Sequence, residues 1–149
     1  KRIESLVEEA VIEGAKVISG GQRDAAYYPP TILTGVNSEL FISCNEAFGP
    51  VLIVEPYSGF QDAVERVNDS DFGLQAGVFT NQMNKTLSAF NQLEVGGVVI
   101  NDVPTFRVDN MPYGGIKDSG FGREGIKYSM QEMSEIKLLV YNHLMENQA

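Results

Sequence analysis

Residues 51–55, VLIVE, form the short and almost entirely apolar run that decides the fold class. Such a run predicts a strand that is buried on both faces, as in parallel sheets. Along the chain it is followed by a helical pattern over residues 58–68, an apolar run over 76–79, a second helical pattern over 83–93 and a last run over 98–100. This alternation predicts right-handed crossovers and therefore an α/β fold, a parallel sheet with flanking helices. Ser58 and Gln61 have the spacing of a capping box for the first of these helices.

The chain before this region predicts a helix, a short strand and an extended segment. Apolar residues recur at helical spacing over residues 3–11, and Gly14 is placed to end that helix. Residues 16–19 predict a strand. The pair Pro29-Pro30 then favours a sheet edge or a loop over a central strand, because proline cannot donate to a sheet ladder.

The chain after this region predicts a long loop, one more helix and one more strand. Residues 101–122 are rich in Gly, Pro, Asp and Asn, and such loops commonly carry function. Ile126, Met130 and Met133 mark the helix, and residues 136–141 the strand.

Composition excludes several classes of function. The chain has 149 residues and a net charge of −9, so a nucleic-acid partner is not expected. No apolar run approaches the roughly 20 residues of a membrane span. One Cys and one His cannot form the usual zinc site, so no metal is expected, and the cytoplasm is the expected location. Because the chain begins with Lys1 and opens directly into a helical pattern, we expect it to be a piece of a longer protein.

Two motifs are weak on inspection. Residues 120–125, GFGREG, match the glycine pattern of dinucleotide-binding turns, but they follow a loop instead of a strand and fit the start of a helix better. Cys44 could be a nucleophile only with a general base, and the single histidine, His143, lies in the polar C-terminal tail. We therefore expect Cys44 to be a small, half-buried residue.

Residues 46–51, EAFGPV, allow two interpretations from their chemistry alone. In one, they are a loop that enters a strand, and Phe48 belongs to the core. In the other, the Glu46 carboxylate accepts two hydroxyls of a sugar while the Phe48 ring packs against a flat ligand.

The whole chain resembles the C-terminal third of the NAD(P)-dependent aldehyde dehydrogenases. The matching stretches are GAKVISGG (14–21), YPPTIL (28–33), EAFGPV (46–51), NDSDFGL (68–74), GVVIN (97–101) and PYGGIKDSG (112–120). The resemblance implies that Glu46 holds the nicotinamide ribose of NAD or NADP and that Phe48 lies against the ribose and nicotinamide. Many members carry a second Glu where this chain has Asn45, but that neighbour is not the ribose ligand.

The resemblance also implies which parts this chain lacks. The nucleophilic cysteine, the general-base glutamate and the cofactor domain are expected upstream, so no catalytic residue is expected here and Cys44 does not match the nucleophile. Residues 1–149 would be one segment of the catalytic domain. Residues 135–142 would be an edge strand that pairs between subunits of a homo-oligomer.

The loop before Pro112 points to the substrate. The resemblance places Phe106, Arg107 and Tyr113 along the aldehyde tunnel and is strongest to members that act on lactaldehyde, phosphonoacetaldehyde or similar short polar aldehydes. An arginine in a tunnel suggests an anionic substrate tail. The alternative is that Arg107 pairs with Asp102 or Asp109 inside its own loop. For the chain as a whole, a non-catalytic binding or assembly module and an enzyme that uses Cys44 stay open as rival functions.

Overall fold

The computed structural model describes residues 1–142, and these residues form two compact units. The first unit contains residues 1–71 and 81–94, and the second contains residues 72–80 together with the chain from residue 95 onward. Both units combine helices and strands, which confirms the α/β class. Among the described residues, no helix is long and apolar enough to cross a membrane. His143 lies outside the described residues.

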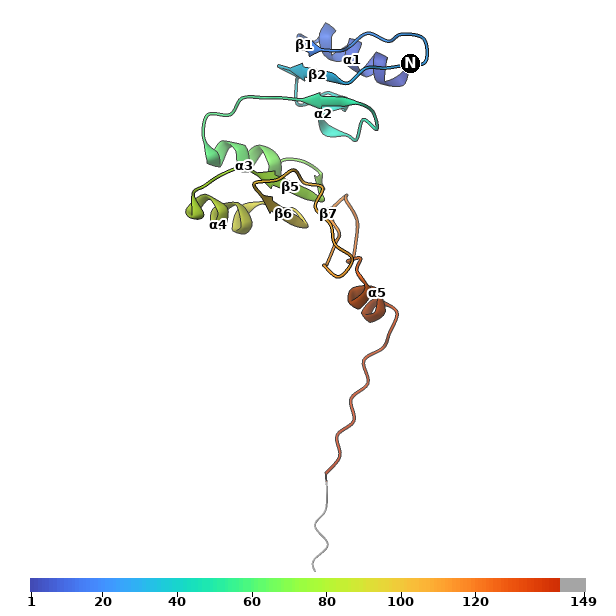
Figure 1. The fold of residues 1–149 in the computed structure, drawn as a ribbon, viewed down its shortest axis with the longest axis vertical. Coiled ribbons are helices and arrows are strands. Elements are labelled where there is room, and N and C mark those ends of the chain that lie inside the picture. The colour runs from blue at the N-terminus through green and yellow to red at the C-terminus, as the bar shows by residue number, and fades with distance from the viewer. Residues whose placement is uncertain (143–149) are drawn as a thin grey trace, which may run out of the picture. The chain divides into compact units, whose positions relative to one another are not determined.

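The first unit contains a three-stranded sheet, two helices that pack against it and two further helices (Figure 1). Its elements are α1 (Arg2–Ile12), β1 (Lys16–Ser19), β2 (Thr31–Thr34), α2 (Phe41–Cys44), β3 (Val51–Ile53), α3 (Phe60–Asn68) and α4 (Met83–Gln92). The predicted helix over residues 3–11 and the predicted strand over 16–19 are confirmed, and Gly14 follows α1 with φ +104°. Glycine adopts this left-handed conformation without steric cost, so it can end the helix at this position.

The order of the first sheet corrects the sequence-based placement of two strands. The sheet runs β1-β2-β3, with β2 antiparallel to β1 and parallel to β3, so β2 is central and not an edge or a loop. Pro29 and Pro30 lie just before the first paired residue, Thr31, and therefore remove no ladder hydrogen bond. β3 is one of the two edge strands, and Leu52 on it is 58% exposed, so the expectation of burial on both faces was wrong.

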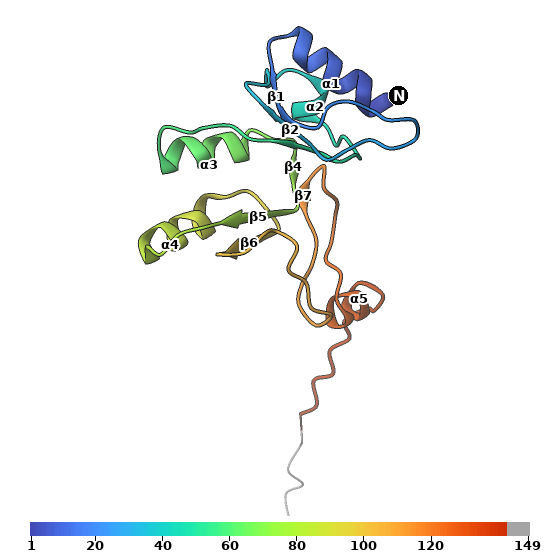
Figure 2. The same cartoon turned by 45° about the horizontal axis from the view of Figure 1, so that its top comes forward.

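An apolar cluster joins α1, α2 and the central strand (Figure 2). Its buried members are Val7, Ala10, Ala15, Leu33 and Ile42. Full burial of such side chains contributes about 1.5–3 kcal/mol each for the larger ones. The cluster therefore holds the helices to the sheet and fixes the segment between α2 and β3.

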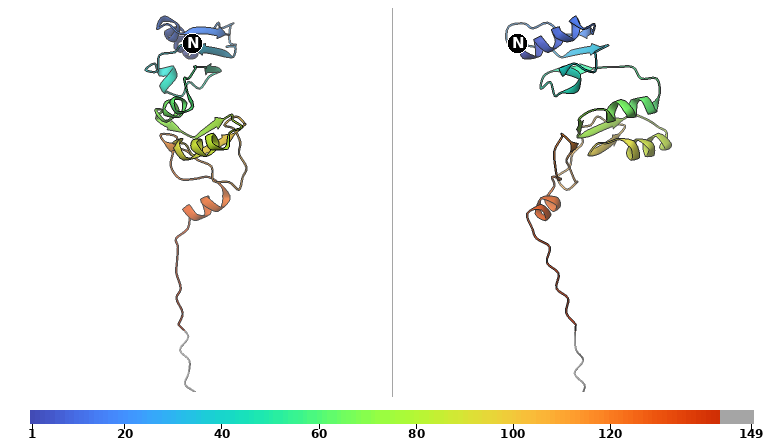
Figure 3. Two further views of the ribbon diagram at one scale, coloured as in Figure 1. Left: turned by 90° about the vertical axis from the view of Figure 1, so that its left-hand side faces the viewer. Right: turned by 180° about the vertical axis from the view of Figure 1, so that it is seen from behind.

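Helices α3 and α4 lie side by side in the same unit (Figure 3). The Asn68 side chain at the end of α3 links them, because its amide donates to the Gln92 carbonyl at 2.7 Å and its oxygen accepts the Glu94 N–H at 2.8 Å. The predicted capping box at the start of α3 does not form, since Gly59 is the N-cap and Gln61 bonds Glu65 instead.

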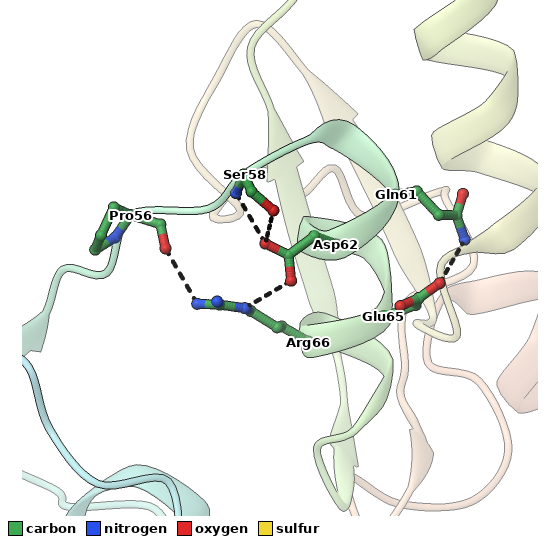
Figure 4. Close-up of polar contacts among 6 residues, drawn as sticks. All are labelled: Pro56, Ser58, Gln61, Asp62, Glu65 and Arg66. Atoms are coloured by element: carbon green, nitrogen blue, oxygen red, sulfur yellow. Dashed lines mark hydrogen bonds and ion pairs between the residues drawn. The ribbon is translucent and has the colours of Figure 1, made fainter.

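The Asp62 carboxylate in the first turn of α3 binds the segment before the helix (Figure 4). Its carboxylate accepts the backbone N–H of Ser58 at 2.9 Å, the Ser58 hydroxyl at 3.1 Å and Arg66 Nε at 3.0 Å. The Ser58 backbone bond, followed by the Ser58 hydroxyl and Arg66, holds the pKa of Asp62 below its ordinary value. A group of this kind favours the folded chain only while it is ionised.

The second unit consists of short strand pairs and one helix. Its elements are β4 (Phe72–Gly73), β5 (Gln75–Val78), β6 (Gly97–Ile100), β7 (Ile116–Lys117) and α5 (Ile126–Glu132). β5 and β6 are parallel neighbours (Figure 1), and β4 pairs antiparallel with β7. The three apolar runs of the sequence therefore do not share one sheet, because β3 pairs with β2 while β5 and β6 pair with each other.

Residues 135–142 belong to no helix or strand. None of the sheets among residues 1–142 contains this segment, so the expected C-terminal edge strand is not formed here. Its pairing with another subunit stays a prediction.

Candidate functional site

The loop between α2 and β3 is held in place by the first turn of α1. Arg2 Nη2 donates to the Ala47 carbonyl at 2.6 Å and to the Phe48 carbonyl at 3.2 Å. A Cβ added to Gly49 would collide with the Ile3 side chain, so only glycine lets the loop approach the helix this closely. These contacts fix the backbone of residues 47–49 from outside the loop.

The same loop exposes its carboxylate and its aromatic ring. Phe48 has φ +46° and is 82% exposed, so its interpretation as a core residue was wrong. Glu46 is exposed, and among residues 1–142 its carboxylate has no hydrogen-bonding or ion-pair partner. A free carboxylate beside an exposed ring can accept hydroxyl groups and stack against a flat ligand.

Among residues 1–142, the hydrogen-bonding neighbours of Cys44 are carbonyl and amide groups and not a base. Its Sγ donates to the Leu40 carbonyl at 3.2 Å, and the Asn45 amide donates to Sγ at 3.3 Å. The thiol is exposed and not half-buried, which corrects the sequence-based expectation. Carbonyl and amide groups do not remove a thiol proton, so these neighbours do not activate Cys44.

In the second unit, Arg107 lies between an acid and an aromatic ring. Its Nη2 contacts Glu124 Oε2 at 2.7 Å, and its Cζ lies 4.6 Å from the centre of the Tyr113 ring. Tyr113 and Glu124 are bridged by two backbone hydrogen bonds, of 3.1 and 2.6 Å. The alternative in which Arg107 pairs with Asp102 or Asp109 is wrong, because its ion-pair partner is Glu124.

This arrangement leaves Arg107 able to bind a further anion. Guanidinium has five N–H donors, and the bond to Glu124 uses Nη2. The Arg107 and Glu124 side chains are 50% and 63% exposed. An ion pair this exposed contributes at most about 1 kcal/mol, so a second carboxylate or phosphate group can share or replace Glu124.

Phe106 and the glycines of residues 120–125 complete this part of the chain. Phe106 is 54% exposed, and its carbonyl accepts Gln75 Nε2 at 3.2 Å. The glycines precede α5, whose N-cap is Gly125, and this confirms that they belong to a helix start. Within residues 1–142, no group of three or more His, Cys, Asp and Glu side chains could hold a metal ion.

The sequence analysis did not identify three residues that hold these groups in place. Arg2 lies 45 residues from the carbonyl it binds, Gln75 lies 31 residues from Phe106, and Glu124 lies 17 residues from Arg107. Periodicity predicts local structure, but contacts of this span depend on how the elements pair. The only hint was that Glu124 belongs to the GFGREG motif.

Comparisons with known proteins agree on one family. The profile of the aldehyde dehydrogenase family matches residues 1–139. The chain is 49% identical over 142 residues to the 3-sulfolactaldehyde dehydrogenase of Priestia megaterium and 46% identical over 142 residues to the lactaldehyde dehydrogenase of Methanococcus aeolicus. Each match covers 95% of this chain and 30% of the relative, so the chain spans less than a third of their length.

Solved structures give the same result. Aldehyde dehydrogenase 21 from Physcomitrella patens, in complex with its reaction product succinate, matches with a TM-score of 0.90 and 48% identity over 94% of this chain and 29% of that one. The glyceraldehyde-3-phosphate dehydrogenase of Methanocaldococcus jannaschii, complexed with NADP, matches with a TM-score of 0.83 and 46% identity. The second match covers 91% of this chain and 29% of the other.

Proposed function

This chain belongs to the aldehyde dehydrogenase family, and from that premise we propose that the whole protein oxidises an aldehyde to a carboxylic acid with NAD or NADP. When bound, NAD(P)+ accepts the hydride that leaves the substrate carbon. Support for the cofactor comes from the Methanocaldococcus jannaschii relative complexed with NADP. The contribution of this chain is to orient the cofactor and the substrate.

The observation that carries the proposal is the fixed loop with a free carboxylate. Arg2 holds the carbonyls of Ala47 and Phe48, which leaves Glu46 and the Phe48 ring exposed on a braced backbone. Glu46 fits the two hydroxyls of a ribose, and Phe48 fits the flat face of a nicotinamide. Charge-assisted bonds of this type contribute roughly 1.5–3 kcal/mol each.

Glu46→Gln in the full-length protein tests this assignment. Because the amide accepts fewer hydrogen bonds, the ribose should be held less firmly, and single-turnover hydride transfer should slow more than cofactor affinity falls. Glu9→Gln, an exposed glutamate on α1, is the matched control and should change neither quantity. Unaltered hydride transfer in Glu46→Gln would remove Glu46 from the site.

For the substrate, we propose a short aldehyde with an anionic tail that Arg107 binds. Two relatives support this, one named for 3-sulfolactaldehyde and one solved with succinate. Phe106 and Tyr113 would line the same tunnel.

Arg107→Ala should lower kcat/KM for an anionic aldehyde by some thirty-fold to a few thousand-fold, equivalent to roughly 2–5 kcal/mol. A neutral aldehyde of equal length should lose far less, and Arg107→Lys should restore part of the loss. Equal losses on both aldehydes would mean that Arg107 only braces its loop.

The isolated 149-residue chain is proposed to be inactive, with the nucleophile and the general base elsewhere in the whole protein. Purified chain should give no aldehyde-dependent NADH. NADH formation that Cys44→Ser abolishes would instead support an enzyme that uses Cys44.

A homo-oligomer assembled through residues 135–142 is a second proposal, favoured by the exposure of their apolar side chains. Ile136 is 101% exposed, Leu138 83% and Leu139 87%. Deleting residues 135–142 from the full-length protein should lower its mass in light scattering. A cytoplasmic location stays a prediction.

A further inference from the structure

The loop that carries Arg107 is fastened to β5 at its first residue. Asn101 donates its backbone N–H to the Val78 carbonyl at 2.9 Å, and its side-chain oxygen accepts the Thr80 N–H at 2.8 Å. Its φ is +60°, which turns the chain out of β6 and into the loop. Asparagine tolerates this left-handed conformation better than most residues.

Gly77 provides the second point of attachment. A Cβ at this position would lie 2.7 Å from the Asp102 carbonyl oxygen and 3.2 Å from Pro104 Cδ. Neither a backbone carbonyl nor a proline ring can swing away, so the loop runs directly over β5 only because residue 77 is glycine.

Gln75 provides the third attachment, two residues earlier on the same strand. Its Nε2 donates to the Phe106 carbonyl at 3.2 Å, and that carbonyl belongs to the peptide bond that joins Phe106 to Arg107. The neighbouring strand leaves room for the amide, since a Cβ at Gly97 would lie 3.3 Å from Nε2 and 3.4 Å from Cγ. The strand pair therefore leaves space in which the Gln75 amide reaches the loop.

Arg107 is thus held at both ends. Gln75 fixes the peptide bond at its backbone, while Glu124 and Tyr113 hold its guanidinium group. We propose that Gln75 is a positioning residue that determines specificity for anionic aldehydes without touching the substrate. This inference rests on the proposed role of Arg107.

The test is Gln75→Met in the full-length protein, because methionine keeps the length of the side chain and removes the donor. We expect kcat/KM for an anionic aldehyde to fall about three- to tenfold, mainly through KM, as one neutral hydrogen bond is lost. A neutral aldehyde of equal length should change less than about twofold. Gln61→Met is the matched control, since its amide bonds Glu65 on an exposed face of α3, and it should change neither value. Gln75→Glu also removes the donor and should reproduce the loss if Gln75→Met fails to fold.

The double variant separates this inference from the proposed function. In an Arg107→Ala background, Gln75→Met should no longer change the ratio between the two aldehydes. If Arg107→Ala changes that ratio and Gln75→Met does not, the positioning role is overturned. If Arg107→Ala leaves the ratio unchanged, the proposal of an anionic substrate fails. Amide hydrogen exchange over residues 102–108 then shows whether Gln75 holds the loop in place. Faster exchange in Gln75→Met would keep Gln75 as a brace of the loop, and unchanged exchange would end that role as well.

Discussion

The two units hold their loops by different means. In the first unit, residues 46–50 lie beside an apolar cluster that includes Leu33 with no exposed surface. In the described part of the second unit, the only buried residues are Gly73 and Gly115, and the chain is joined by backbone pairs, close glycine contacts and polar side chains. Apolar burial tolerates small changes in a loop, whereas a hydrogen bond or a close glycine contact depends on the position of single atoms. The comparison implies that the first loop has an apolar core behind its individual contacts, whereas the second loop depends on individual contacts alone.

The largest loss of stability should come from a cavity in the core of the first unit. Leu33→Ala removes a fully buried side chain and should lower the free energy of unfolding by about 2–5 kcal/mol, measured in urea. Leu52→Ala on β3, where the side chain is 58% exposed, should cost less than about 1 kcal/mol. Similar losses for both variants would contradict the claim that the first unit depends on its core.

The next largest effect should come from a single methyl group in the second unit. A Cβ at Gly96 would collide with the Gly114 carbonyl oxygen, and backbone cannot rotate out of the way. Gly96→Ala should therefore cost about 1–3 kcal/mol. Gly59→Ala, where a Cβ would meet nothing within 4 Å, should cost less than about 1 kcal/mol. Thermal unfolding of both variants checks the difference.

A smaller effect should follow from loss of the contact between Arg2 and the first loop. Arg2→Met removes two hydrogen bonds at an exposed site, worth together about 1 kcal/mol. Single-turnover hydride transfer in the full-length protein should therefore slow about fivefold. Arg23→Met, whose guanidinium contacts Glu4 and not the loop, is the control and should leave the rate unchanged. A normal rate in Arg2→Met would show that the core alone holds this loop.

The smallest effect should be the pH dependence of the Asp62 carboxylate. Because the pKa of Asp62 is lowered in the folded state, the carboxylate stabilises the fold at pH values above its unfolded-state pKa. This stabilisation is lost as the pH falls through the folded-state pKa. Asp62→Asn should lower the Tm slightly at pH 7, and the two curves should converge in acid. A Tm difference that stays constant down to acid pH would assign the effect to packing.

Helices α1, α3, α4 and α5 follow from local patterns, and so do strands β1, β3, β5 and β6. The short elements α2, β4 and β7 and the pairing of the strands do not. The stripe over residues 3–11 and the glycine after it predict α1, and the run over residues 16–19 predicts β1. Nothing local indicates that β3 pairs with β2 and not with β5. Pro29-Pro30 led to the wrong prediction for residues 31–34, because a proline pair just before a strand has the same sequence signal as one at a sheet edge.

For the site, the sequence identifies the groups that we propose to face a ligand but not the groups that hold them. Glu46, Phe48 and Arg107 stand in motifs, so their types and order are informative. Their supports, Arg2 and Glu124, act across folded segments and are only recognised once the contacts are known.

The exposed strip at residues 136–140, IKLLV, has a practical consequence for handling the chain on its own. Short segments of high β-propensity with one charge are prone to stack into fibrils. The net charge of −9 opposes such contacts near neutral pH by mutual repulsion. Near the isoelectric point of about 4.5, acid removes that repulsion by protonating carboxylates, so turbidity should precede unfolding in an acid titration. Dilute samples at low ionic strength, where the remaining repulsion is least screened, keep the two events apart.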